Sequence, residues 1–255
     1  MWISGVFLTK LSTYKGAMYI LRKKNLIIIS VLIVTALTFL LCFGALAANP
    51  TDDTLANKIK IVLDAGHGGI DGGVLGINTG VKESELNLKV VKKLEGYLLS
   101  AGMNVVLTRS TDAGLYGIAT TNLKRKDMEK RKEIINKANP DLVISVHMNK
   151  YSVSTRRGAQ VFYKDGSEGG KVLAKSVQES FNAMSEASRK CSALTGDYYI
   201  LNCSEYPSII AECGFLSNPE DETLLVSDEY QDSIAYAIFK GVIGYLAQSS
   251  FSFCC

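Results

Sequence analysis

Short apolar runs and amphipathic segments alternate along the chain from residue 58 onward. The apolar runs predict strands at 58–63, 104–108, 142–146, 159–163 and 208–211. Segments with apolar residues three and four positions apart predict helices at 84–100, 127–138, 170–184 and 230–246. Strands that alternate with helices are typical of an α/β fold, in which a mostly parallel sheet is flanked by helices on both faces.

An uncharged apolar segment at residues 26–48 precedes this pattern. A helix of about 20 apolar residues spans a bilayer core, and the basic cluster at 22–24 predicts that the end before it stays in the cytoplasm. Small residues at 45–47 also fit the cleavage site of a signal peptide. A retained transmembrane anchor and a cleaved signal both stay open, with Met1 or Met18 as the start, and both place the body outside the cytoplasm.

Charge and composition divide the rest of the chain. Residues 1–25 hold five of the 28 lysines and arginines and no acidic residue, which indicates a basic cytoplasmic leader. The polar residues 49–57 predict a linker, residues 58–248 one domain with a sizeable core, and residues 249–255 a tail that matches no pattern. Without its leader the chain has no basic excess, which argues against nucleic-acid binding.

The six cysteines do not form a CxxC pair, so the sequence gives no support to a thiolate zinc site. In an exported body Cys191 and Cys203 form either a disulfide or two free thiols, and both readings stay open. Cys254 and Cys255 are the last two residues of the sequence, and no pattern in it assigns them a role.

The chain contains only two histidines, and both follow predicted strands. His67 lies in a glycine-rich turn after the first strand, and His147 comes directly after the third. Functional groups of α/β sheets collect at the carboxyl ends of the strands, so neighbouring strands would bring both imidazoles into one crevice. The alternative is that each histidine is an ordinary polar residue with a satisfied hydrogen bond.

Two histidines and one carboxylate are a suitable ligand set for a catalytic zinc, which keeps its fourth position open. The carboxylate candidates are Asp64, Asp71, Glu83 and Glu85, and spacing alone does not choose among them. Glu83 begins a predicted helix, where its simpler role is to interact favourably with the helix dipole.

Glu212 ends the apolar run of the last predicted strand. Burying an unpaired carboxylate is costly, so this position favours either a proton-transferring group or a salt bridge at the rim of the sheet. Other hydrolase signatures are missing, because the sequence has no HExxH helix and no GxSxG turn, and its glycine-rich turns lack the Lys-Ser/Thr of a phosphate loop.

Five ordered blocks of sequence resemble the zinc-dependent N-acetylmuramoyl-L-alanine amidases of the Amidase_3 family. The blocks are IVLDAGHGG (61–69), VKESELNL (81–88), VVLTR (105–109), Arg131 with ANPDLVISVHMN (138–149), and PSIIAECGFLSN (207–218). The resemblance covers about residues 58–247. It implies an α/β fold and hydrolysis of the amide bond between N-acetylmuramic acid and L-alanine in peptidoglycan.

The same resemblance assigns roles to individual residues. It implies that His67, Glu83 and His147 bind Zn²⁺ and that Glu212 is the catalytic glutamate. Asn149 and Arg109 stand at motif positions that imply substrate contacts, although Arg109 has a structural alternative, hydrogen bonding to loop carbonyls.

Within the family, the short chain with one apolar N-terminal segment is similar to the membrane-tethered, germination-specific amidases. This similarity implies action on spore cortex, where removal of stem peptides allows muramic-δ-lactam to form, in the forespore or cortex compartment. The interval 148–211 shows no inserted inhibitory helix, so control is expected from a protein partner or from metal supply. A vegetative autolysin and a non-catalytic wall-binding module are the alternatives.

Overall fold

The computed structural model describes residues 35, 59–187 and 189–252. The chain divides into two compact units, Met1–Asp52 and Asp53–Cys255, and every element described below belongs to the second. The predicted leader, the linker and all of the apolar segment 26–48 except Thr35 lie outside the described residues. No helix within the described residues has the length and apolar character that a membrane crossing requires.

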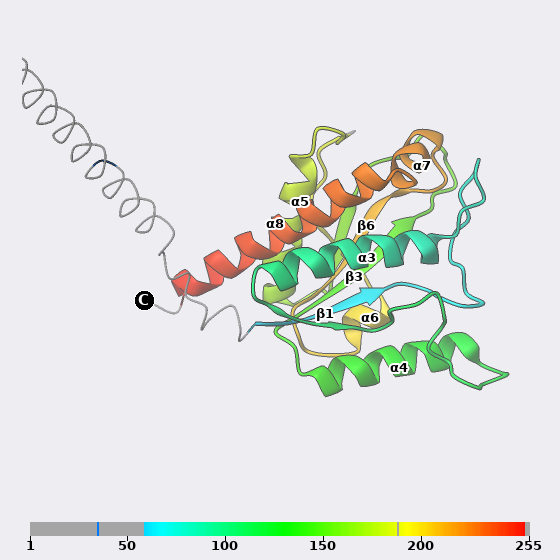
Figure 1. Cartoon of the computed structure of the whole chain (residues 1–255), viewed down its shortest axis with the longest axis horizontal. Helices are drawn as coiled ribbons and strands as arrows, with labels where there is room; N and C mark the ends of the chain where they lie inside the picture. Colours follow the sequence, from blue (N-terminus) through cyan, green and yellow to red (C-terminus); the bar gives the residue numbers. More distant parts are fainter. Residues whose placement is uncertain (1–34, 36–58, 188, 253–255) are drawn as a thin grey trace, which may run out of the picture. The chain divides into compact units, whose positions relative to one another are not determined.

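Strands and helices alternate along the second unit, as the sequence pattern predicts (Figure 1). In chain order they are β1 (Lys60–Ala65), α3 (Glu83–Ser100), β2 (Asn104–Leu107), α4 (Leu123–Ala138), β3 (Leu142–Asn149), β4 (Gln160–Tyr163), α5 (Glu168–Asn182), β5 (Leu194–Thr195), α6 (Tyr199–Asn202), β6 (Ser208–Phe215), α7 (Pro219–Leu225) and α8 (Asp228–Ser252).

The strands form one six-stranded sheet in the order β2-β1-β3-β6-β4-β5. All neighbours run parallel except β4 and β6, which pair antiparallel. The prediction of a mostly parallel sheet is therefore confirmed. Because β1, β3 and β6 are parallel neighbours, the residues at their carboxyl ends meet at one edge of the sheet.

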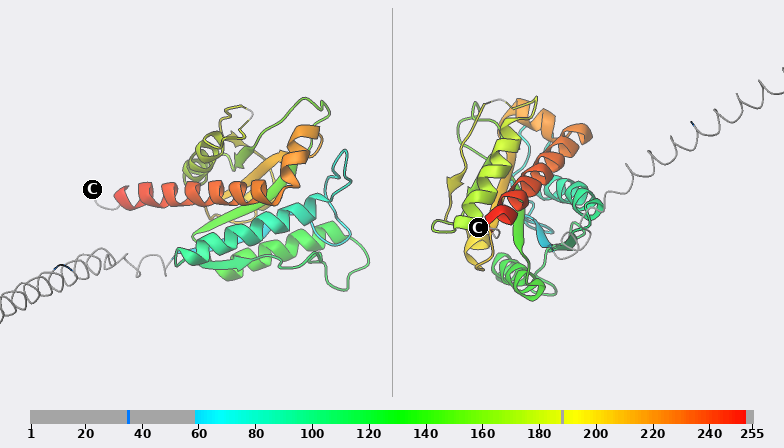
Figure 2. Two further views of the ribbon diagram at one scale, coloured as in Figure 1. Left: turned by 45° about the horizontal axis from the view of Figure 1, so that its top comes forward. Right: turned by 90° about the vertical axis from the view of Figure 1, so that its left-hand side faces the viewer.

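Helices cover both faces of this sheet, which confirms the predicted layers. Helices α3, α5 and α8 pack on one face, and α4 and α6 lie on the other (Figure 2). The core beneath the first three helices is the larger one, and a smaller cluster lies beneath α4 and α6.

Alternation along the strands decides which face receives polar residues. Ile61, Leu63 and Ala65 of β1 enter the larger core, whereas Val62 enters the smaller cluster. Asp64 follows Val62 on the α4 face, because side chains two residues apart on a strand share a face. His147 and Glu212 lie on that face by the same parity, so its carboxyl end is polar.

Several predicted boundaries and pairings change in the structure. Strands β3 and β6 continue to Asn149 and Phe215, so His147 and Glu212 lie inside strands rather than at the ends of shorter ones. Helix α8 continues to Ser252, into the predicted tail. Elements β5, α6 and α7 are additions to the predicted set. Cys191 and Cys203 are free thiols, and no disulfide joins them.

Candidate metal centre and active site

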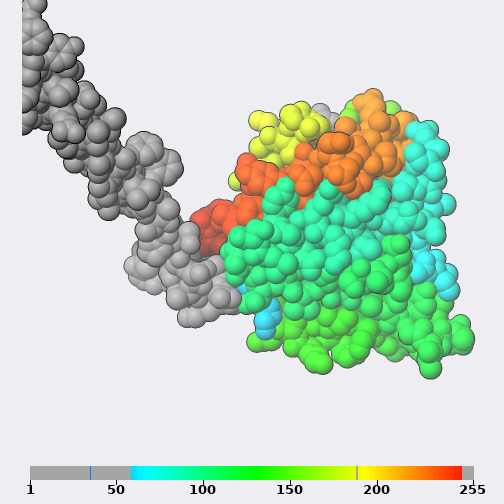
Figure 3. All heavy atoms as spheres, viewed as in Figure 1, coloured from blue at the N-terminus to red at the C-terminus, as the bar shows by residue number. Residues whose placement is uncertain are grey.

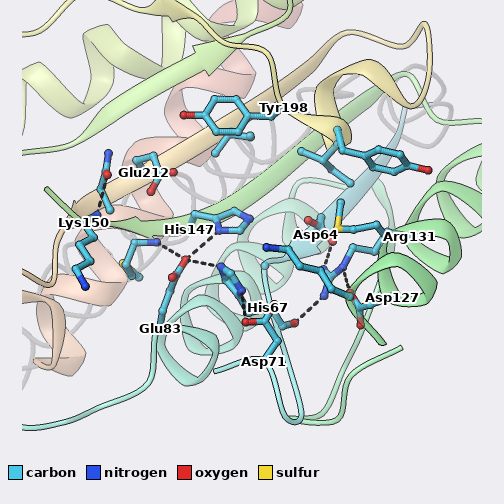
Figure 4. A pocket seen from close by; sticks show the side chains of 18 residues that line it. Asp64, His67, Asp71, Glu83, Asp127, Arg131, His147, Lys150, Tyr198 and Glu212 are labelled. Atoms are coloured by element: carbon cyan, nitrogen blue, oxygen red, sulfur yellow. Dashed lines mark hydrogen bonds and ion pairs between the residues drawn. The ribbon is translucent and has the colours of Figure 1, made fainter. Parts of the chain in front are cut away.

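Three side chains from different elements converge at the carboxyl edge of the sheet (Figure 4). His67 lies two residues beyond β1, Glu83 is the first residue of α3, and His147 lies in β3. One ligand atom from each side chain lies within 4.8 Å of the others. Of the four carboxylates that spacing left open, Glu83 is the one that joins both histidines.

The separations within this cluster fit a zinc site. Glu83 Oε1 lies 2.9 Å from His147 Nδ1 and 3.3 Å from His67 Nε2. Two zinc bonds of about 2.0–2.1 Å at a tetrahedral angle place their ligand atoms about 3.3 Å apart. Two imidazoles and one carboxylate also make a three-ligand set, which leaves a fourth position for a water or a substrate.

Backbone and side-chain donors fix the Glu83 carboxylate. Oε2 accepts a hydrogen bond from the Val74 N–H at 2.9 Å, and Oε1 accepts from the Met148 N–H at 3.2 Å. Asn87, one helical turn along α3, donates from Nδ2 to Oε1 at 3.3 Å. These bonds pre-organise the carboxylate for a ligand role, because they set its orientation without a metal.

Electrostatics keep Glu83 and His67 charged in the metal-free protein. Burial alone would raise the pKa of Glu83, but its hydrogen bonds and ion pairs with His147 and His67 hold it well below its usual range. Burial alone would lower the pKa of His67, but the hydrogen bond and charge of Glu83, joined by those of Asp71, raise it to about 9. Asp71 Oδ1 lies 2.9 Å from His67 Nδ1, which leaves Nε2 to face the cluster.

The turn that carries His67 depends on its glycines. His67 has a φ of 60°, in the left-handed region, which costs a non-glycine residue about 1–2 kcal/mol. Gly66 lies so close to the His147 ring that an added Cβ would collide with ring atoms. A side chain at residue 66 would therefore displace one of the two imidazoles.

Two buried arginines hold the carbonyl groups of this turn. Arg109 donates to the carbonyls of Ala65, Gly66, Ser84 and Thr111 at 2.8–2.9 Å. Arg131 donates from Nη1 to the Ala65 carbonyl at 2.8 Å and from Nη2 to the His67 carbonyl at 2.6 Å. We call these two side chains the arginine cradle. Guanidinium groups are suited to this because they present several donors in a fixed plane.

Two acidic residues neutralise Arg131 of the cradle, and one of them is a ligand candidate. Arg131 Nη1 lies 2.5 Å from Asp64 Oδ1, and its Nε lies 2.6 Å from Asp127 Oδ2. Asp64 also accepts hydrogen bonds from Thr108 and Ser145 at 2.7 and 2.6 Å. The carboxylate of Asp64 is therefore fully used in a buried ion pair and takes no part in the ligand cluster.

Glu212 faces the ligand cluster from the neighbouring strand (Figure 4). It is the register partner of His147, and its Oε2 is buried with no hydrogen-bond partner among the described residues. Burial raises the pKa of Glu212 to about 7. An orphaned carboxylate oxygen beside a three-ligand cluster is well placed to hold a proton during a reaction.

These groups line a cleft of about 410 Å³. Asn149 lines it together with Lys124, Lys150 and Tyr198. Arg109 and Glu85 are not among its lining residues, and the donors of Arg109 are taken by backbone carbonyls.

The sequence pattern did not identify Asp71 as an orienting group for His67, Asn87 as a contact of Glu83, or the ion pairs of Arg131. The i, i+4 spacings of Glu83 with Asn87 on α3 and of Asp127 with Arg131 on α4 were local signals for such contacts.

Comparisons with known proteins agree with this geometry. The Amidase_3 profile, described as N-acetylmuramoyl-L-alanine amidase, matches residues 61–244. The germination-specific N-acetylmuramoyl-L-alanine amidase of Bacillus subtilis (strain 168) is 34% identical over 198 residues, which span 76% of this chain and 82% of that protein.

Solved structures show the same fold. The CwlD amidase of Clostridioides difficile, determined in complex with the GerS lipoprotein, has a TM-score of 0.72 and 36% identity over 74% of this chain and 99% of its own. An N-acetylmuramoyl-L-alanine amidase from Clostridium difficile 630 has a TM-score of 0.67 and 29% identity, and the match covers 75% of this chain and 98% of that chain. The chain therefore belongs to the Amidase_3 family and is a hydrolase of the N-acetylmuramoyl-L-alanine amidase class.

Proposed function

We propose that this amidase is zinc-dependent, with His67, Glu83 and His147 as the metal ligands and Glu212 as the catalytic glutamate. The observation that carries the proposal is the convergence of the three ligand atoms beside the orphaned Oε2 of Glu212. The bond hydrolysed joins the lactyl group of N-acetylmuramic acid to the L-alanine of the peptidoglycan stem peptide.

The residues of the chain supply proton transfer and orientation. When bound, zinc acts as a Lewis acid that polarises a carbonyl group and makes a water molecule more acidic. Glu212 accepts the proton of the attacking water on its unpartnered oxygen and returns it to the departing amine of L-alanine. In the metal-free protein burial raises the pKa of Glu212 to about 7, and a group that titrates near neutral pH both accepts and releases a proton readily.

The walls of the cleft suit an anionic peptide. Lys124 and Lys150 place positive charge beside the ligand cluster, and stem peptides carry free carboxylates. We assign Asn149, which lines the cleft, to substrate contact. We assign Arg109 to holding the His67 turn, in line with its four carbonyl contacts.

The substitution Glu212→Gln tests the mechanism, because it keeps the shape of the side chain and removes its base. We expect zinc binding and thermal stability to stay near wild type, while release of stem peptides from purified peptidoglycan falls by at least about 100-fold. The matched control is Glu205→Gln, at an exposed glutamate whose ion pair within the described part of the chain is with Lys164. Release by Glu212→Gln at the rate of that control would contradict the proposed role.

We further propose that the substrate is spore cortex and that the body acts outside the cytoplasm, either anchored or released from the segment 26–48. The similarity to the germination-specific amidase of Bacillus subtilis supports this. Muropeptide analysis of spores from a deletion strain is the test, and the expected result is loss of muramic-δ-lactam. Spores that keep the lactam would favour a vegetative autolysin instead.

We also propose a regulatory protein partner. The support is the similarity to the CwlD amidase that was solved with a lipoprotein. Co-purification of the tagged chain from sporulating cells should recover such a partner at near-stoichiometric amount, and recovery of the chain alone would contradict it.

A further inference from the structure

A short hairpin delivers the metal ligand Glu83 to the site. Residues 74–82, which we call the ligand hairpin, lead from the glycine-rich turn into α3. A bridge pairs Leu75 with Lys82, and the Gly76 N–H donates to the Val81 carbonyl at 2.9 Å. Val74 and Val81 at the base of the hairpin pack against the larger core, whereas Leu75 and Ile77 are more than half exposed, so packing holds the base more firmly than the tip.

The tip of the ligand hairpin is held by a carboxylate from a distant part of the chain. Glu222 of α7 is only 1% exposed. Its Oε1 accepts hydrogen bonds from the Thr79 N–H at 2.8 Å and the Thr79 hydroxyl at 2.7 Å, and its Oε2 accepts from the Asn78 N–H at 2.9 Å. In Figure 3 the cyan surface of this region lies against the orange surface of α7.

The base of the hairpin is tied to Glu83. The Glu83 N–H donates to the Val74 carbonyl at 2.9 Å, and the Val74 N–H donates to Glu83 Oε2 at 2.9 Å. Val74, the first residue of the hairpin, therefore fixes the positions of both the backbone and the carboxylate of Glu83. Movement at the tip reaches Glu83 through the pairing of residues 75 and 82.

Helix α7 is a firm support for this contact. Asn218 caps it by accepting from the N–H groups of Glu220 and Asp221 at 3.0 and 2.9 Å. The helix follows directly after β6, the strand that carries Glu212. An added Cβ at Gly76 would collide with the Glu222 carboxylate, so a residue without a side chain permits the close approach.

We propose that Glu222 is a positioning residue that fixes the ligand hairpin for metal binding and joins the segment of Glu83 to the strand of Glu212. The inference rests on the zinc site proposed above. Without Glu222, the N–H groups of residues 78 and 79 lose their acceptor and the hairpin samples other conformations. Zinc binding must then order the hairpin again, and loss of such supporting contacts costs about 10–100-fold in metal affinity.

The test compares Glu222→Ala and Glu222→Gln with Asp221→Asn. Asp221 is the neighbouring buried carboxylate of α7, and it accepts from the N–H groups of Phe215 and Gly158 rather than from the hairpin. Zinc affinity is measured by competition with a chromophoric chelator, and amide hydrogen exchange at Asn78 and Thr79 is measured on the metal-free chain. The milder variant Thr79→Val is included in case the alanine variant does not fold; it removes the hydroxyl that donates to Glu222 Oε1 and accepts from the Val81 N–H at 3.2 Å, and it keeps the backbone N–H of residue 79.

We expect both Glu222 variants to bind zinc at least tenfold more weakly and to exchange the two amides at least tenfold faster, with Asp221→Asn close to wild type in both readouts. Wild-type zinc affinity in a folded Glu222→Ala variant, or an equal loss in Asp221→Asn, would overturn the proposal. The two proposals fail separately: a wild-type chain that binds no zinc contradicts the metal site itself, whereas unchanged affinity in the variants contradicts only the role of Glu222.

Discussion

Replacing Arg131 with methionine should destabilise the protein strongly. Arg131 is 1% exposed and pairs with the equally buried Asp64 at 2.5 Å. Removing one partner of such a pair leaves an uncompensated buried charge and costs about 3–5 kcal/mol. That loss is a large part of the whole stability of a domain, which is about 5–15 kcal/mol.

Urea unfolding followed by far-UV circular dichroism measures this loss. Arg125→Met on the same helix is the matched control, because Arg125 forms an i, i+4 ion pair with Glu129 at 2.8 Å in an exposed setting. Exposed pairs of this kind contribute little to stability, because water and salt screen both charges, so this variant should unfold close to wild type. The double variant Asp64→Asn/Arg131→Met should lose less than Arg131→Met alone, because it removes both charges.

The pH dependence gives a second check on the same pair. Burial alone would raise the pKa of Asp64, but Arg131 and the hydrogen bonds from Ser145 and Thr108 lower it to about 2. Its contribution is therefore present above about pH 4 and is lost as the pH falls toward 2. In Arg131→Met the effect of burial on Asp64 is no longer opposed by Arg131, so the pKa of Asp64 is raised. The difference in free energy of unfolding between wild type and this variant should therefore narrow as the pH falls from 7 toward 3. A loss below 1 kcal/mol at pH 7, or a gap that widens in acid, would refute the reasoning.

Two further predictions concern the ligand cluster. His67 has a pKa of about 9 in the metal-free protein, so zinc must displace its proton. Zinc affinity measured by calorimetry should therefore rise about tenfold per pH unit up to about pH 9. A zinc affinity that does not change between pH 7 and 9 would contradict this. The same proton stabilises the metal-free fold below about pH 6.5, and that stability is lost as the pH rises through 9. Gly66→Ala should weaken zinc binding by at least tenfold because its Cβ meets the His147 ring, whereas Gly96→Ala, in open space on α3, should leave zinc binding unchanged and raise stability by about 0.5–1 kcal/mol.

The strands and long helices were predictable because their apolar spacing reflects the cores that they fill. The carboxyl ends of β3 and β6 were not, since His147 and Glu212 interrupt the apolar runs while the backbone continues its pairing. Helix α7 did carry local signals, with Asn218 as the cap, Pro219 next and acidic residues in the first turn. Elements β5 and α6 are two and four residues long, too short for any period to show.

The choice of Glu83 over Asp64 as the proposed third ligand could not come from spacing. Both carboxylates lie near His67 in the fold. Asp64 is excluded by a residue distant in the sequence, because its charge is paired with Arg131. The family resemblance pointed to Glu83, and the structure places it in the cluster. Glu222 gave no local sign of its contact, since its partners lie 143 and 144 residues earlier in the chain.

The arginine cradle allows this protein to fold independently of the proposed zinc ion. Zinc-finger domains fold only when they bind metal, because metal coordination supplies most of their folding free energy. Here the turn that carries His67 is shaped by guanidinium–carbonyl hydrogen bonds, which exist whether or not an ion is present. We therefore expect the chain to stay compact and resistant to proteolysis in zinc-poor surroundings, and to bind the proposed ion later without refolding.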